Sequence, residues 1–89
     1  MKCDCCGKKK RLFESFAAVQ AKSEQLNLCV ECNDMAYKVR DDINDQNEEK
    51  YKLHLEQWKK RTMSPSKKFV EWQETFLTAL EQKLNQSKK

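Results

Sequence analysis

Five cysteines lie in the first part of the chain, and four of them form two Cys-x-x-Cys pairs. The pairs are Cys3 with Cys6 and Cys29 with Cys32, and 22 residues separate them. Four thiolates at this spacing suit the tetrahedral coordination of Zn²⁺ at about 2.3 Å. Because four protein ligands leave no position for water or substrate, we expect a structural zinc site. An iron site with the same ligands, a disulfide or redox pair, and cysteines without a metal are the alternatives.

The residues around the two pairs resemble a treble-clef or zinc-ribbon finger. The resemblance rests on Cys3-x-x-Cys6-Gly7-Lys8 as a zinc knuckle, a short hairpin, and Cys29-x-x-Cys32 at the start of a helix, all within residues 1–45. Glycine after the knuckle reaches φ > 0 without steric cost. The resemblance implies zinc as cofactor and a role in nucleic-acid binding, protein docking or scaffolding. Cys5 departs from the pattern, either as a substitute for Cys3 or Cys6 or as a free thiol.

Two units are expected along the chain, a zinc finger over residues 1–32 and a helical hairpin over residues 33–89 that packs on the finger or continues it. In the finger, the alternation of apolar and polar residues at 26–29 predicts a short β-hairpin with residues 11–19. Residues 16–22 fit a helical turn equally well.

Two helices are expected after the finger. No Gly or Pro interrupts the apolar stripe from residue 33 to 61, which predicts one long amphipathic helix. Pro65, capped by Ser64, then begins a second helix that extends to residue 84. The large aromatic residues of the two stripes are expected to share one seam. The fold class we predict is small and mainly α, with an N-terminal four-cysteine zinc finger, a short hairpin and a two-helix antiparallel hairpin.

Composition limits the classes of function. The chain has 89 residues, of which 38% are hydrophobic and 36% charged, so it cannot enclose a large substrate cavity and we expect no enzyme. The lysine-rich start has no apolar run that would indicate a secretory signal, and no window approaches a membrane span. We therefore expect a cytoplasmic protein with reduced thiols and no membrane partner.

The net charge of +4 comes from both ends of the chain. Basic residues beside the finger and at the start of the second helix could contact phosphate groups or an acidic partner. The acidic middle of the chain gives phosphate no continuous track. The candidate contact residues are Lys8, Lys9, Lys10, Arg11, Lys67 and Lys68.

These observations predict a non-enzymatic zinc-binding adaptor or regulatory protein that docks on a macromolecular partner. The Lys-, Asn- and Gln-rich composition suits a phage or bacterial regulator of host machinery. Direct DNA or RNA binding by the zinc finger is the main alternative, and thiol redox chemistry at Cys5 is a third. We expect a protein partner, and a homodimer formed through the helices stays open.

Overall fold

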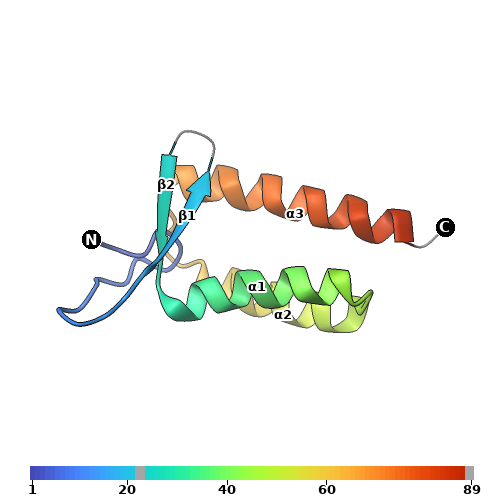
Figure 1. Cartoon of the computed structure of the whole chain (residues 1–89), viewed down its shortest axis with the longest axis horizontal. Helices are drawn as coiled ribbons and strands as arrows, with labels where there is room; N and C mark the ends of the chain where they lie inside the picture. The colour runs from blue at the N-terminus through green and yellow to red at the C-terminus, as the bar shows by residue number, and fades with distance from the viewer. Residues whose placement is uncertain (22–23, 88–89) are drawn as a thin grey trace.

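The computed structural model describes residues 1–21 and 24–87 and contains a two-stranded sheet and three helices (Figure 1). The predicted small, mainly α fold with an N-terminal cysteine cluster and an antiparallel hairpin is confirmed. The elements in chain order are β1 (Ala17–Ala21), β2 (Glu24–Leu28), α1 (Val30–Asn44), α2 (Glu48–Arg61) and α3 (Lys67–Ser87).

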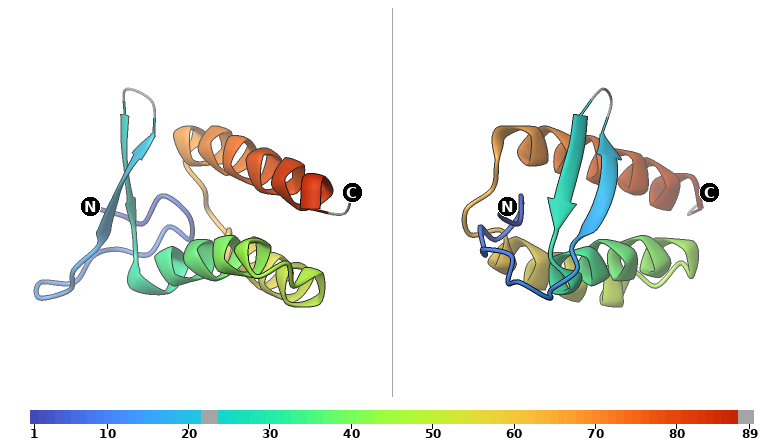
Figure 2. Two further views of the ribbon diagram at one scale, coloured as in Figure 1. Left: turned by 45° about the vertical axis from the view of Figure 1, so that its right-hand side comes forward. Right: turned by 60° about the vertical axis from the view of Figure 1, so that its left-hand side comes forward.

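The hairpin pairs Ala17 with Leu28 and Val19 with Leu26 in an antiparallel register. Leu26 and Leu28 are fully buried, whereas Asn27 between them is only half-buried, as expected for a strand with one face on the core. The alternative of a helical turn over residues 16–22 is therefore wrong for its described part, and Lys22 lies outside the described residues. In Figure 2 the hairpin crosses one end of the helices, from the start of α1 toward the start of α3.

The single helix predicted over residues 33–61 is wrong, because the chain turns back between α1 and α2. Gln46 adopts a left-handed φ of 57° and donates its N–H to the Ile43 carbonyl, and the Asn47 N–H donates to the Asp42 carbonyl. This pair of hydrogen bonds is a Schellman motif, which ends a helix. The Asn47 side chain then accepts the Lys50 N–H and caps α2. The first antiparallel helical hairpin is consequently α1 with α2.

The start of the last helix also differs from the prediction. Helix α3 begins at Lys67 rather than at Pro65 and extends to Ser87. The hydroxyl of Ser66, not that of Ser64, accepts an N–H of the first turn, from Phe69 at 3.3 Å. Pro65 therefore lies in the connecting turn, where its missing N–H costs no helical hydrogen bond.

Trp58 of α2 is the centre of the helical core. Its side chain is fully buried and packs edge-to-face against Phe69, Trp72 and Phe76 of α3, with ring centroids 6.2, 6.1 and 5.8 Å away. Edge-to-face pairs at this separation add to the free energy gained from burial. The predicted aromatic seam between the helices is confirmed, and α2 and α3 run antiparallel along it (Figure 1).

The proposed division of the chain at residue 32 stays a prediction. Cys32 lies in the first turn of α1, so the cysteine-rich segment and the helices are continuous at this point. Among the described residues, no helix has the length and apolar character needed to cross a bilayer.

Candidate metal centre

The first cysteine pair lies on a tight turn at the start of the chain. The Cys3 N–H donates to the Lys8 carbonyl at 2.8 Å, and the Gly7 N–H donates to the Cys3 carbonyl at 3.0 Å. Gly7 has φ +80°, and a Cβ added to it would lie 2.8 Å from the Cβ of Ser64. The predicted need for glycine after the knuckle thus has two physical reasons, a left-handed backbone and a close neighbour.

The second pair lies where β2 passes into α1. Cys29 is the N-cap residue of α1 and Cys32 lies in its first turn, so one helical start presents both sulfurs. The Asn33 N–H donates to the Cys29 carbonyl at 2.9 Å, which fixes this turn. The Cys29 N–H donates to the sulfur of Cys3 at 3.3 Å and joins the two pairs directly.

The structure brings the four predicted ligands together in a cluster of sulfurs. The Sγ atoms of Cys3, Cys6, Cys29 and Cys32 all lie within 4.8 Å of one another. Four sulfurs around Zn²⁺ at about 2.3 Å are about 3.8 Å apart along each tetrahedral edge. The sulfurs of Cys6 and Cys29 are separated by 3.8 Å. The cluster can hold a metal ion.

Backbone donors and burial act in opposite directions on these thiols. Burial raises the pKa of Cys3, but hydrogen bonds from the backbone N–H groups of Cys29, Cys6 and Cys5 outweigh it and lower the pKa to about 7. Burial raises the pKa of Cys29. A thiol that ionises near neutral pH is ready to ligate a metal, and a bound cation would favour the thiolate form of the others.

Arg61 is a component of the site that the sequence did not predict. It is the last residue of α2, and its guanidinium interacts with the thiol of Cys32 and then with that of Cys29, which raises the pKa of Arg61. Its Nε atom is buried and forms no hydrogen bond with a described residue. A cation at this position can offset the excess negative charge of four metal-bound thiolates. No sequence signal distinguished Arg61 from the other cations at the end of its helix.

Cys5 is fully buried and lies outside the cluster of four sulfurs. Its sulfur lies 3.4 Å from the hydroxyl oxygen of Thr62, just after α2. A hydrogen bond with Cys32 is the main cause that lowers the pKa of Cys5. Cys5 therefore joins the knuckle to the end of α2, and the assignment of Cys3 and Cys6 as the first pair of ligands remains our interpretation.

The turn between α2 and α3 braces the knuckle. The Ser66 N–H donates to the Asp4 carbonyl at 2.9 Å, and the Ser64 N–H donates to the Cys5 carbonyl at 3.4 Å. On the other side, Asp4 and Asn27 exchange two hydrogen bonds of 2.7 Å, which fasten the knuckle to β2. The knuckle thus contacts both β2 and the turn that precedes α3.

The predicted basic residues are divided between two places. Lys9, Lys10 and Arg11 are exposed, whereas Lys8 forms an ion pair with Glu14 at 2.5 Å. Lys67 and Lys68 lie at the start of α3, where Lys68 donates to the Gln25 carbonyl at 2.8 Å. In Figures 1 and 2 the start of α3 lies away from the loop that follows the knuckle. The structure does not join the two groups into one basic surface.

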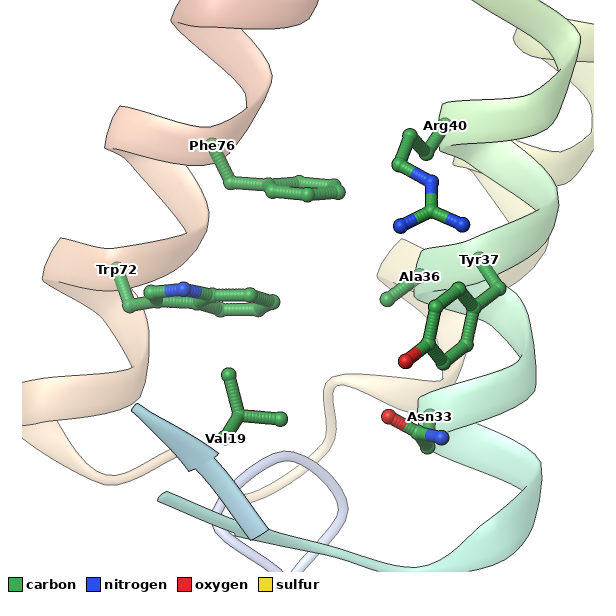
Figure 3. Close-up of a pocket in the computed structure, with 7 residues that line it drawn as sticks. All are labelled: Val19, Asn33, Ala36, Tyr37, Arg40, Trp72 and Phe76. Carbon is green, nitrogen blue, oxygen red and sulfur yellow. The ribbon is translucent and has the colours of Figure 1, made fainter. Parts of the chain in front are cut away.

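A groove of about 180 Å³ lies between α1, α3 and β1 (Figure 3). The rings of Trp72 and Phe76 stack with centroids 5.0 Å apart, and in Figure 3 they project across the groove toward α1, Phe76 toward Arg40 and Trp72 toward Ala36. The guanidinium of Arg40 lies 4.6 Å from the ring centroid of Tyr37. From the sequence, Trp72 and Phe76 were predicted only for the aromatic seam between the helices, and no role was predicted for Tyr37.

No known family model, curated protein or solved structure matches this chain. The resemblance to a zinc finger therefore rests on the residues themselves. A four-cysteine cluster beside a β-hairpin is present, and the assignment to the treble-clef or zinc-ribbon class stays a prediction.

Proposed function

We propose that this protein is a non-enzymatic zinc-binding adaptor that docks on another macromolecule. The observation that carries the proposal is the cluster of four sulfurs from Cys3, Cys6, Cys29 and Cys32, three of them on buried residues. An ion held by four thiolates keeps no coordination position for substrate or water. Such a site serves stability, so function has to come from the surface that the metal holds in place.

Zinc is the metal that this donor set fits best. Four thiolates in a tetrahedral arrangement favour Zn²⁺ or iron, and they disfavour magnesium and calcium, which prefer oxygen. When bound, the ion would supply cross-linking of the knuckle to α1. Arg61 would offset the negative charge of the thiolates, and the hydrogen bonds between Asp4 and Asn27 orient the knuckle.

Docking as a single chain is supported by how the aromatic stripes are used. Trp58 packs against the aromatic residues of α3 in the same chain. The apolar stripes of α2 and α3 therefore contact each other, and little of them is left to form a homodimer. The groove of Figure 3 and the exposed loop after the knuckle are both accessible to a partner.

Direct binding of DNA or RNA is the second candidate function. The observation that favours it is the exposed run Lys9, Lys10 and Arg11, none of which forms an ion pair with a described residue. The pairing of Lys8 with Glu14, and the distance of the second basic group, leave few cations for a phosphate track. Redox chemistry at Cys5 has less support, because its thiol is fully buried.

Two measurements on the full chain as purified test the proposal. The first is metal content, for which we expect one zinc ion per chain. The second is binding to a short DNA duplex and to single-stranded RNA as salt rises from about 50 to about 200 mM. Phosphate contacts release counterions, so affinity that is tight and falls by orders of magnitude over this range would replace docking with nucleic-acid binding. Weak binding throughout is the result expected of an adaptor.

A further inference from the structure

The loop between the knuckle and β1 ends in a β-turn that is fixed by its own hydrogen bonds. The Glu14 N–H donates to the Arg11 carbonyl at 3.2 Å, and a Glu14 carboxylate oxygen accepts the Arg11 N–H at 3.1 Å. The other carboxylate oxygen of Glu14 pairs with Lys8. In Figures 1 and 2 this loop, drawn in blue, projects from the body of the molecule. The turn is thus preorganised without help from the side chains at its two central positions.

Those two central positions hold Leu12 and Phe13, which are 85% and 95% exposed. The central residues of β-turns are usually Gly, Pro, Asn, Asp or Ser, for reasons of backbone conformation and local hydrogen bonding. Large apolar residues there help neither the turn nor the core. A sequence that breaks a local rule with no gain in folding commonly does so at a functional site.

Cations border the apolar tip. Lys9, Lys10 and Arg11 lead into the turn and are exposed, and Lys2 pairs with Lys9 in a β-bridge that adds a fourth cation to this side. The nearest acid along the loop, Glu14, is already paired with Lys8. The tip is therefore an apolar projection with a basic collar, and its complement is an apolar cleft with an acidic rim.

We propose that Leu12 and Phe13 are the docking anchor of this protein, and that they insert into an apolar cleft bordered by carboxylates on a protein partner. This inference rests on the proposed adaptor function and names its contact surface. Few residues carry most of the energy of an interface, and they are commonly large side chains held rigid before binding. Phe13 is a large aromatic side chain, and the hydrogen bonds between Arg11 and Glu14 fix the backbone that carries Leu12 and Phe13 before binding.

Two other surfaces fit the loop less well. In a membrane, two inserted side chains with a few cations would give only a reversible attachment, similar to that of a single acyl chain. On nucleic acid, the short basic collar provides few phosphate contacts. The protein cleft is the one surface that would bury both apolar side chains completely.

Site-specific photocrosslinking tests the proposal. A benzoylphenylalanine replaces Phe13 in the full, zinc-loaded chain, and the matched control carries it at exposed Thr78 on α3. In a lysate of the source cell, we expect position 13 and not position 78 to label one protein. Excess wild-type chain should abolish labelling, and the double variant Leu12→Ser, Phe13→Ser should not.

The labelled protein is then purified and titrated with the full chain. We expect Leu12→Ser, Phe13→Ser to weaken Kd at least about 30-fold, which corresponds to loss of a hot spot. The change of Lys9, Lys10 and Arg11 to Gln should slow association at low salt and affect dissociation less. The double variant should keep its zinc and its unfolding midpoint, since neither side chain supports the fold.

Several results would overturn the inference. They are equal labelling from both positions, no labelling from position 13, or equal competition by the double variant. Binding to vesicles that contain phosphatidylserine or to a DNA duplex, if it depended on Leu12 and Phe13, would assign the loop to those surfaces. A partner that binds elsewhere on the chain would leave the adaptor function intact and refute only this contact. Absence of any partner would refute both.

Discussion

The guanidinium of Arg61, at the last residue of α2, lies beside the thiol of Cys32 in the first turn of α1. This contact joins the end of one helix to the metal-binding start of another. Zn²⁺ with four thiolates carries a net charge of −2, so a cation beside it lowers the cost of placing that charge among buried cysteines. We infer that metal binding and the packing of α2 stabilise each other.

Replacement of Arg61 by Gln should therefore weaken zinc binding. Outer partners of metal ligands typically change affinity by about 10- to 100-fold, and we expect a loss in this range. Competition with a chromophoric chelator measures the affinity, and the rate of thiol alkylation should rise in parallel. Arg61→Lys keeps the charge without the planar donor group, and its affinity should fall between the two. Unchanged affinity in Arg61→Gln, with helical content intact, would show that Arg61 has no such role.

Removal of one ligand should cost the metal and most of the structure around it. In Cys32→Ser we expect loss of zinc and of ordered structure in the first 45 residues, because structural zinc contributes on the order of 10 kcal/mol of apparent binding energy. Elemental analysis and backbone NMR spectra report the two losses.

Cys5→Ser is the matched control, since its hydroxyl can keep the contact with Thr62. This variant should retain one zinc ion per chain. Zinc retained by Cys32→Ser and lost by Cys5→Ser would reverse the ligand assignment.

The sequence predicted the metal cluster better than it predicted the helices. Each Cys-x-x-Cys pair is local, so its spacing alone indicates that two sulfurs can face one ion. Arg61 reaches the cluster only because the chain folds back at Gln46, and a glutamine in a left-handed conformation leaves no signal like that of glycine. The aromatic seam around Trp58 was predictable, because the helical periodicity of its apolar stripe is visible in the sequence, and Trp58 is fully buried in the structure.

Gln46→Gly should stabilise the protein. A non-glycine residue with φ 57° carries a conformational cost of about 1–2 kcal/mol, and the larger entropy of glycine in the unfolded chain offsets part of the gain. We expect a net increase of about 0.5–1 kcal/mol in the free energy of unfolding, measured with urea at saturating zinc.

Gln57→Gly is the control of the same residue type, since Gln57 is exposed inside α2. Glycine there should lower the free energy of unfolding by about 1 kcal/mol. A loss of stability in Gln46→Gly as large as in Gln57→Gly would contradict the Schellman geometry at the end of α1.

Gly7→Ala should strongly destabilise the knuckle, for two reasons that a double-mutant cycle separates. The alanine would have to adopt the φ of +80° that Gly7 has, and its Cβ would lie 2.8 Å from the Cβ of Ser64. We expect a loss of roughly 2–4 kcal/mol in the free energy of unfolding, together with weaker zinc binding.

Ser64→Gly removes the side chain that the new methyl group at position 7 would meet, and it keeps the backbone hydrogen bond from residue 64 to Cys5. Alone, it should cost no more than about 1 kcal/mol. Combined with Gly7→Ala, it should recover about 1 kcal/mol or more relative to the sum of the single changes, because the collision is absent. The backbone strain at position 7 has no such remedy and should persist in the double variant. If the two changes in the free energy of unfolding were strictly additive, position 7 and the side chain of Ser64 would not be in contact. The packing of the knuckle against the turn between α2 and α3 would then be refuted at this position.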